Sequence, residues 1–473
     1  MTPRRAGILA ATAVLIASLL IAFVCWFPLS LGPRVVLEPY LLTQGFSHYT
    51  DIVDQHEPAL TAVVVLLIRA GLSPITAATA VFLAIQGVIV VSLLLVGRRF
   101  GEWVGVLAVL LYAASAPGIV QGKLWYDMAM GPLLVAAAAL LMGPSPPSRR
   151  RSVLSGLALG LAFLVKQHAV IAIGLVLVWL VLEWGVRHGL PAAIRLLAAA
   201  SALPAAHLLW RLSTGSLRDY LHWCWFINDR YLNLAVLWPT RAQLVELIPL
   251  ALLLSLSLTL WRNRSYRLML LMAAGAAALA FPRYAHFHLA AALPLLSLLA
   301  AMTVRESLRR HGIVAGFLDR ITIPRPAVSL IVIGLAFASA HPWLKAGQAV
   351  RVEEYDPLEP LGQILEQRLP EGRSMVIFPE DEAVSNLYIQ AGRYPPGHWM
   401  LTYPWYIEPA IIERLIADLS RADLVVFFPG RELQGRLPED YMRPYYEAIL
   451  EQFPVVEEST WEQGRVMLRT RRL

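Results

Sequence analysis

The sequence predicts a polytopic α-helical membrane protein that ends in a soluble α/β domain. Hydrophobic residues make up 57% of the 473 residues and charged residues only 15%, against roughly 25% in soluble domains. The mean hydropathy is +0.58. This composition excludes the disordered, collagen-like, disulfide-stapled and ordinary soluble classes. The two cysteines, Cys25 and Cys224, are too few for a disulfide framework or a cysteine-based metal site.

The charges divide the chain into two parts. Residues 1–343 hold 26 basic and 12 acidic residues, whereas residues 344–473 hold 14 basic and 21 acidic residues. We therefore predict a transmembrane domain over 1–343 and an extracytoplasmic α/β domain over 344–473. The net charge of +7 does not indicate a nucleic-acid partner, because the basic residues lie between apolar runs, where membrane topology explains them.

Apolar runs predict about eleven transmembrane helices. The first run, Ile8–Phe27, is long for a signal peptide, which favours a first transmembrane helix. Several other runs are shorter than the ~20 residues that a perpendicular span needs, so we expect those helices to tilt or to line a cavity. The other runs lie near 75–96, 104–120, 128–143, 153–165, 169–186, 193–210, 243–261, 268–281, 287–303 and 327–341.

The distribution of arginine predicts the orientation in the plasma membrane. If the N-terminus is cytoplasmic, the inside segments carry 17 basic residues and the outside segments nine. This bias agrees with the positive-inside rule. An odd number of spans then places the C-terminal domain outside the cytoplasm.

The outside segments have patterns of their own. The long first loop, 28–73, contains the helix-like stretch Pro58–Ala70, and the segment 212–241 is rich in aromatic residues typical of a membrane interface. In the tail, alternating helix and strand patterns predict a small domain with a partly parallel sheet. The predicted helices are Leu358–Arg368, Pro409–Leu419 and Tyr441–Phe453, and the predicted strands are Ser374–Phe378, Leu424–Phe428 and Val466–Arg469.

Acidic residues gather in the first outside loop. Glu38, Asp51, Asp54 and Glu57 lie within 20 residues of one another, and they directly precede an apolar helix. A solvated acidic loop would explain the charge but not this position. Carboxylates clustered at a membrane interface can share a proton, bind a metal or act as a general base.

Two basic groups interrupt apolar runs. Lys166 lies in the middle of the stretch 153–186, and a cation at the bilayer centre costs at least ~2.5 kcal/mol, so we expect a turn between two helices there. Arg283, His286 and His288 lie between two short spans. These cations suit an anionic group such as a phosphate; snorkelling or interfacial turns are the structural alternatives.

Other polar residues carry less functional weight. Asp127, Asp219, His222 and Asp229 are expected to be solvated or structural rather than catalytic. His286 and His288 could join the loop carboxylates in a metal site, but their spacing is weak evidence. We therefore predict no metal and no other cofactor.

The order of these motifs resembles that of the GT-C glycosyltransferases. The branch is that of bacterial relatives of protein mannosyltransferases and lipid A aminoarabinose transferases. The matching features are the loop ending in Tyr49-Thr-Asp51 before the helix at Pro58, the segment from Gly156 to Gln167, and Pro282-Arg283-Tyr284. The resemblance covers about residues 8–305.

The resemblance implies a GT-C-like fold and transfer of a hexosyl or pentosyl group from a polyprenyl-phosphate sugar on the outer membrane face. An acid of the first loop would act as general base on a lipid, glycan or protein acceptor, with inversion at the anomeric carbon. Asp51 is the first candidate, Asp54 the second and Glu38 the third. The donor phosphate would be bound by the cations Lys166, Arg283, His286, His288 and His56.

Two other classes remain open from the sequence. A membrane transporter or lipid flippase would use charges within its spans and often shows internal repeats, whereas the acids here cluster in an outside loop. A noncatalytic assembly subunit would only present the soluble tail. Turnover of a lipid-linked sugar separates the enzyme from both.

Overall fold

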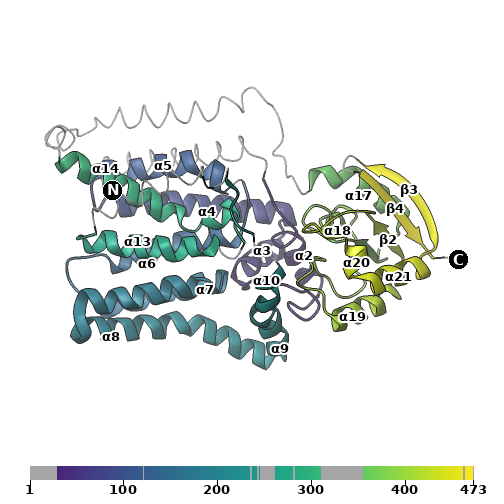
Figure 1. Ribbon diagram of the computed structural model, residues 1–473, viewed down its shortest axis with the longest axis horizontal. Helices are drawn as coiled ribbons and strands as arrows, with labels where there is room; N and C mark the ends of the chain where they lie inside the picture. The colour runs from purple at the N-terminus through teal and green to yellow at the C-terminus, as the bar shows by residue number, and fades with distance from the viewer. Residues whose placement is uncertain are drawn as a thin grey trace, which may run out of the picture. The chain divides into compact units, whose positions relative to one another are not determined.

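The computed structural model describes residues 29–120, 122–234, 237–241, 244, 261–280, 283–310, 355–461 and 464–471. The predicted spans Ile8–Phe27 and 327–341, and most of 243–261, lie outside the described residues. The number of spans, eleven, therefore stays a prediction. The chain divides into two compact units (Figure 1), which we call the helical unit and the mixed unit and describe separately.

The helical unit contains Ala80–His207 and the described residues of 237–310. Its helices overlap the predicted apolar runs, because an uninterrupted apolar stretch bounded by glycine, proline or arginine is a strong local signal. The helix Leu293–Arg310 begins later than the predicted run 287–303, because a 3-10 helix occupies His286–Leu289. Helices α6 and α7 pack together, and α14 packs against α5, α6 and α13. The helices are α4 (Pro74–Gly97), α5 (Glu102–Val120), α6 (Tyr126–Leu141), α7 (Arg149–Val165), α8 (Ala169–Ser213), α13 (Arg264–Ala277) and α14 (Leu293–Arg310).

Helices α7 and α8 approach each other through small residues. A Cβ atom added to Gly156 or Gly160 would collide with the backbone oxygen of Leu196 or Ala200 on α8. Two glycines spaced four apart let helix backbones come this close, as is common in membrane bundles. The predicted runs 169–186 and 193–210 are two helices within α8, separated at Gly185, whose φ of 63° and ψ of 176° are not helical.

Two described helices, Pro74–Gly97 and Ala169–Ser213, are long and apolar enough to cross a membrane by length and composition. Ala59–Arg69, Trp103–Ala113 and Tyr126–Leu141 are apolar but shorter.

The mixed unit combines three segments that are far apart in the sequence: Ser30–Thr79, 208–234 and the described residues of 355–471. The first contains α2 (Leu37–Thr43) and α3 (Ala59–Arg69), and the second contains α9 (Leu217–Leu221), the π-helix η1 (His222–Phe226) and α10 (Asn228–Leu234). The predicted helix Pro58–Ala70 corresponds to α3. The predicted boundary near residue 343 stays a prediction, and the first loop belongs to the same compact unit as the tail.

A four-stranded sheet forms the centre of the tail, with the order β1-β2-β4-β3. Strands β1 and β2 are parallel, and the other two neighbouring pairs are antiparallel, so the sheet is partly parallel, as predicted. Strand β3 was not predicted, because its acidic residues break the apolar pattern; it is an edge strand, where charge is usual. The strands are β1 (Met375–Phe378), β2 (Leu424–Phe427), β3 (Val455–Trp461) and β4 (Gly464–Thr470).

Helices cover both faces of this sheet (Figure 1). Val376 and Val425 point to one face with α19 and α21, whereas Ile377 and Val426 point to the other with α17 and α18. This alternation is the period of two expected for strands. The helices are α17 (Glu359–Arg368), α18 (Leu387–Gln390), α19 (Pro409–Leu419), α20 (Pro438–Tyr441) and α21 (Arg443–Gln452). Helix α19 has the predicted bounds. The predicted helix 441–453 corresponds to α21, which Met442 separates from α20.

Candidate functional site

Five ionisable residues of the loop after the first predicted span form one buried cluster in the mixed unit, which we call the loop cluster: Arg34, Glu38, His48, Asp54 and His56. His48 Nε2 lies 2.9 Å from Glu38 Oε1 and 3.9 Å from Asp54 Oδ2. His56 Nδ1 lies 2.8 Å from Asp54 Oδ1. The Arg34 guanidinium donates a hydrogen bond to that same oxygen. Two of the three predicted acids, with His56, therefore come together.

The backbone around Tyr49 holds this cluster in shape. Tyr49 has a φ of 73°, a left-handed conformation that is strained for a bulky residue. Its ring stacks on His48 with a centroid distance of 3.8 Å, and its hydroxyl donates a 2.7 Å hydrogen bond to the backbone oxygen of His56. The contacts on both sides hold the chain in this turn, so His48 and His56 flank Asp54.

Asp51 has a different environment. Its carboxylate accepts a 2.7 Å hydrogen bond from the backbone N–H of Ser47, which closes the turn 47–51, and the residue is half-buried. This is the usual role of an aspartate in a turn. Asp51 thus stabilises the loop, and it lies outside the contacts that define the loop cluster.

Burial and charge separate the two carboxylates of the loop cluster. Burial raises the pKa of Glu38, and the nearby Asp54 charge raises it further. Burial alone would raise the pKa of Asp54, but His56 and Arg34 outweigh it and hold that pKa well below its usual range. For His48, burial favours the neutral form, yet the Glu38 and Asp54 carboxylates together outweigh burial and raise the His48 pKa. Carboxylates with opposite shifts in one site are typical of acid–base chemistry.

Two carboxylate oxygens of the loop cluster make no hydrogen bond to the described part of the chain. Glu38 Oε2 and Asp54 Oδ2 are both buried and lack a donor. A buried polar atom without a partner costs about 1–3 kcal/mol, so it is rare unless a ligand supplies the partner. A hydroxyl group that donates to either oxygen would satisfy it.

The loop cluster is also the place where a metal ion could be held. One ligand atom from each of Glu38, His48 and Asp54 lies within 4.8 Å of the others. Arg34 already neutralises Asp54, and a guanidinium beside a bound dication would repel it. The donor set alone therefore does not require a metal.

Glu57 lies beside the loop cluster in a second buried network. Its two carboxylate oxygens accept hydrogen bonds of 2.9 and 3.0 Å from the Tyr220 hydroxyl. Burial raises the pKa of Glu57 to about 8. Arg211 lies over the Tyr49 ring at 4.5 Å from the centroid. Glu57 thus ties the segment 208–234 to the first loop.

A second ionic cluster lies in the helical unit and consists of Asp127, Lys166 and His288; we call it the lysine cluster. Lys166 Nζ donates to both carboxylate oxygens of Asp127 at 2.8 Å, and His288 Nδ1 lies 2.9 Å from Asp127 Oδ2. Lys166 lies in the predicted turn between α7 and α8, but its side chain is only 8% exposed. Two residues predicted to bind phosphate therefore share a carboxylate.

The remaining predicted cations lie near His288 in sequence. Arg283 is half-buried, and its backbone pairs with Leu237. His286 begins the 3-10 helix η3 (His286–Leu289) and lies edge-on to Tyr284 at 5.5 Å. The structure thus holds both residues in one short segment of the helical unit.

Sequence reasoning missed the central role of Arg34 and gave Asp127 only a structural role. Arg34 follows Gly32-Pro33 in an otherwise apolar stretch. A buried arginine needs an acidic partner, so an arginine in this position indicates an ion pair with one of the loop acids. Asp127 carried no local signal, because its partner Lys166 is 39 positions away.

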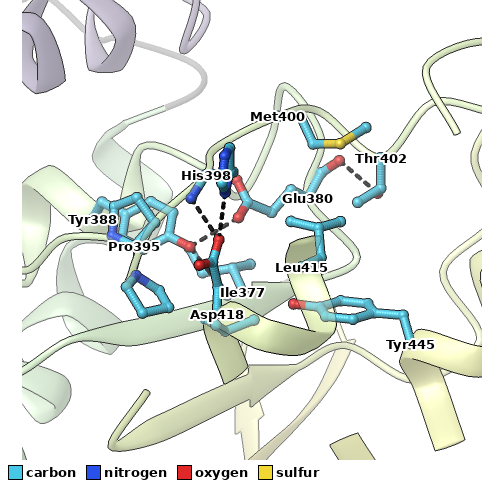
Figure 2. A pocket seen from close by; sticks show the side chains of 12 residues that line it. Ile377, Glu380, Tyr388, Pro395, His398, Met400, Thr402, Leu415, Asp418 and Tyr445 are labelled. Carbon is cyan, nitrogen blue, oxygen red and sulfur yellow. Dashed lines mark hydrogen bonds and ion pairs between the residues drawn. The ribbon is translucent and has the colours of Figure 1, made fainter. Parts of the chain in front are cut away.

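The tail contains a small pocket beside strand β1 (Figure 2). Glu380 accepts a 2.8 Å hydrogen bond from the Tyr388 hydroxyl. Asp418 accepts a 2.7 Å bond from the backbone N–H of His398, and the His398 ring Nδ1 lies 2.8 Å from the same oxygen. These polar side chains bind one another, which indicates a structural role.

Glu380→Gln should make the protein less sensitive to alkaline pH. Burial raises the pKa of Glu380 to about 8, so the neutral carboxyl favours the folded state at low pH. That contribution is complete below the ordinary pKa of 4.5 and is lost as the pH rises through about 8. We expect the melting temperature of the wild type to fall more than that of Glu380→Gln between about pH 5 and about pH 9. Glu366→Gln, at an exposed position of α17, is the control; equal slopes in all three proteins would contradict the expectation.

The fold of the chain is the GT-C fold of membrane glycosyltransferases, a polytopic helical membrane fold. ArnT from Cupriavidus metallidurans bound to undecaprenyl phosphate is 15% identical, with a TM-score of 0.60 over 98% of this chain and 97% of that chain. The same protein in the apo state has a TM-score of 0.61 at the same identity and coverage.

The oligosaccharyltransferase of Archaeoglobus fulgidus tethered to an acceptor peptide is 12% identical, with a TM-score of 0.50 over 98% of this chain and 74% of that chain. At these identities the likeness establishes the fold, and it confirms the fold that the motifs predicted. No protein-family model and no curated protein matches the sequence.

Proposed function

We propose that the protein is an integral-membrane glycosyltransferase that moves a hexosyl or pentosyl group from a polyprenyl-phosphate donor to an acceptor hydroxyl. The observation that carries this proposal is the loop cluster, in which two buried carboxylate oxygens, beside two histidines and Arg34, lack a donor in the part of the chain that the structure describes. Support for the donor class comes from the shared fold, since one ArnT structure of that fold has undecaprenyl phosphate bound.

In the proposed reaction, Glu38 accepts the proton of the acceptor hydroxyl. The acceptor oxygen then attacks the anomeric carbon from the face opposite the phosphate. The bond from that carbon to the phosphate oxygen breaks, and the lipid phosphate leaves with the electron pair, which inverts the anomeric configuration. A raised pKa makes Glu38 the better proton acceptor. Asp54, which Arg34 and His56 keep ionised, would balance the charge on His48.

The sequence pattern favours Asp51 as the base, whereas the geometry favours Glu38. Asp51 uses a carboxylate oxygen to close its own turn. We retain Asp51 and Asp54 as alternatives that single substitutions distinguish.

Turnover of a radiolabelled polyprenyl-phosphate sugar by the purified protein tests the function directly. We expect labelled acceptor and free lipid phosphate, and the same rate in EDTA, because the proposed reaction needs no metal. Absence of turnover with every donor and acceptor tried, together with transport of an intact lipid across vesicles, would indicate a transporter or flippase instead.

Arg283→Ala should weaken donor binding without unfolding the protein. Arg283 is half-buried in a short segment between helices of the helical unit, and a guanidinium can bind a phosphate bidentately. Loss of a charge-assisted hydrogen bond costs about 1.5–3 kcal/mol, so the donor Kd should rise roughly 10- to 100-fold. Arg305→Ala in the last turns of α14 is the control. Equal Kd values in the wild type and Arg283→Ala would remove Arg283 from the phosphate site.

The proposed outer-face chemistry requires the C-terminal domain to lie outside the cytoplasm. A phosphatase reporter that works only outside the cytoplasm, fused after Leu473, should be active, and a reporter that works only inside should be silent. The arginine distribution is the reason for this expectation. The reverse pattern would place the reaction on the cytoplasmic face.

A further inference from the structure

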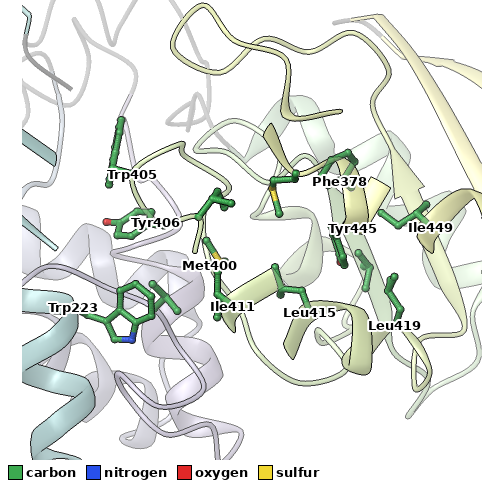
Figure 3. Close-up of a cluster of buried hydrophobic side chains, with 14 of the residues drawn as sticks. Trp223, Phe378, Met400, Trp405, Tyr406, Ile411, Leu415, Leu419, Tyr445 and Ile449 are labelled. Atoms are coloured by element: carbon green, nitrogen blue, oxygen red, sulfur yellow. The ribbon is translucent and has the colours of Figure 1, made fainter. Parts of the chain in front are cut away.

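The first outside loop and the C-terminal domain share one hydrophobic core. Tyr49 and Val53 of the loop pack in the same cluster as Trp223 and Tyr406. Figure 3 shows part of this cluster, with Trp223 and Tyr406 labelled. On the other side, Leu37 and Leu41 of α2 and Ile52 pack with residues of the tail such as Trp399. A shared core means that these segments form one cooperative structure.

Backbone hydrogen bonds fix the loop at two points. The Val53 N–H donates to the Trp399 oxygen at 3.0 Å, and the Trp399 N–H donates to the Asp51 oxygen at 2.8 Å. Both bonds lie directly before Asp54. The Asn386 side chain donates to the Leu31 oxygen at 3.0 Å, three residues before Arg34. The tail therefore holds the chain on both sides of the Arg34–Asp54 pair.

One side chain of the tail reaches the loop cluster itself. Arg34 Nη2 donates to the Tyr406 hydroxyl at 2.8 Å, and Nη1 of the same guanidinium binds Asp54 and lies 3.3 Å from His56 Nδ1. Arg34 is 3% exposed and Tyr406 is fully buried. Because a guanidinium is a rigid plane, a partner that fixes Nη2 also fixes the direction of Nη1.

We infer that Tyr406 is a positioning residue for the proposed sugar transfer, acting through Arg34 on the carboxylates of the loop cluster. The inference rests on the proposed function, and it gives the C-terminal domain a part in the reaction although it contributes no catalytic residue. If the contact between Tyr406 and Arg34 only stabilised the fold, its loss would not change the rate or the pH dependence of sugar transfer.

Arg34 lowers the pKa of both Asp54 and Glu38. If the guanidinium is held less firmly, both carboxylates should retain their protons to higher pH. The acidic limb of the pH–rate profile should then shift to higher pH, whichever of the two carboxylates is the base. The charged or titratable groups that face this pair are Arg34, His48, His56, Glu57, Tyr49, Cys224 and Tyr406.

Tyr406→Phe keeps the ring beside Arg34 and removes only the hydroxyl. We expect an unchanged donor KM, a kcat at least about tenfold lower at neutral pH, and an acidic limb shifted to higher pH. Arg34→Lys should act in the same direction, and the double variant should be little worse than Arg34→Lys alone. Tyr441→Phe is the matched control, because its hydroxyl binds a backbone oxygen within the tail, that of Thr402, at 2.6 Å.

A kcat and acidic limb at wild-type values in Tyr406→Phe would overturn the inference, and so would equal losses in Tyr406→Phe and Tyr441→Phe. If the wild type turns over no lipid-linked sugar, the proposed function fails. Amide hydrogen exchange then still tests the positioning. Peptides covering residues 49–56 should exchange faster in Tyr406→Phe than in Tyr441→Phe, and equal exchange would refute it.

Discussion

We expect Glu38→Gln to slow sugar transfer by ~10²–10⁴-fold, the usual cost of losing a general base, while donor binding stays at the wild-type level. Glutamine keeps the size of the side chain and can still contact His48, but it cannot accept the proton. Glu38 is fully buried, its Oε2 atom has no donor among the described residues, and burial raises its pKa. Single-turnover transfer of labelled sugar and a separate donor-binding measurement distinguish the two steps.

Asp51→Asn and Asp54→Asn complete this series. Asparagine at position 51 still offers an oxygen to the Ser47 N–H, so we expect near-normal transfer. At position 54, the change removes the carboxylate that Arg34 and His56 share, so transfer should also fall. If Asp51→Asn is inactive and Glu38→Gln is normal, the choice made from the sequence pattern is right. Normal transfer in all three variants would remove the catalytic site from the first loop.

The longer helices and three of the four strands that the structure describes were predictable, because their signals are local, whereas short helices such as α2 and α18 were not predicted. Helix α19 has the predicted bounds, Pro409–Leu419, since a proline opens it and an amphipathic pattern continues for three turns. Helix α4 extends the predicted run by one residue at each end. Strand β3 has no such signal, because Glu457 and Glu458 interrupt the alternating apolar pattern of a strand.

The sequence predicts which loop holds the site but not which residues contact each other within it. The acidic loop was found from its composition, but the partners of its carboxylates come from other places in the chain. Arg34 lies 20 positions from Asp54, and Tyr406 lies 372 positions from Arg34. No local pattern encodes such contacts, which form only when three separate segments share a core. A cation between apolar runs, such as Lys166, likewise gives no sign of whether its partner is a ligand or an aspartate.

We expect Lys166→Met to destabilise the protein strongly, and its partner Asp127 is the reason. Removing one member of a buried ion pair leaves the other charge uncompensated, which typically costs about 3–5 kcal/mol. Both Asp127 oxygens accept from Lys166 Nζ at 2.8 Å, and Asp127 is fully buried. Thermal unfolding of the purified protein in detergent should show a large decrease in melting temperature. Lys123→Met is the matched control, because Lys123 is half-buried and lies over Trp125 and Phe287 at 4.7 Å from each ring centroid.

The double variant Asp127→Asn/Lys166→Met decides between a structural pair and a phosphate ligand. It removes both charges together, so much of the lost stability should return. If Lys166 serves mainly to neutralise Asp127, the folded double variant should bind the lipid-linked donor with a Kd close to that of the wild type. If Lys166 binds the donor phosphate, as the sequence pattern predicts, the double variant should be stable and yet bind the donor weakly. A Lys166→Met single variant with wild-type stability would contradict the structural role, because loss of the lysine leaves a buried carboxylate whose described ionic partner is His288.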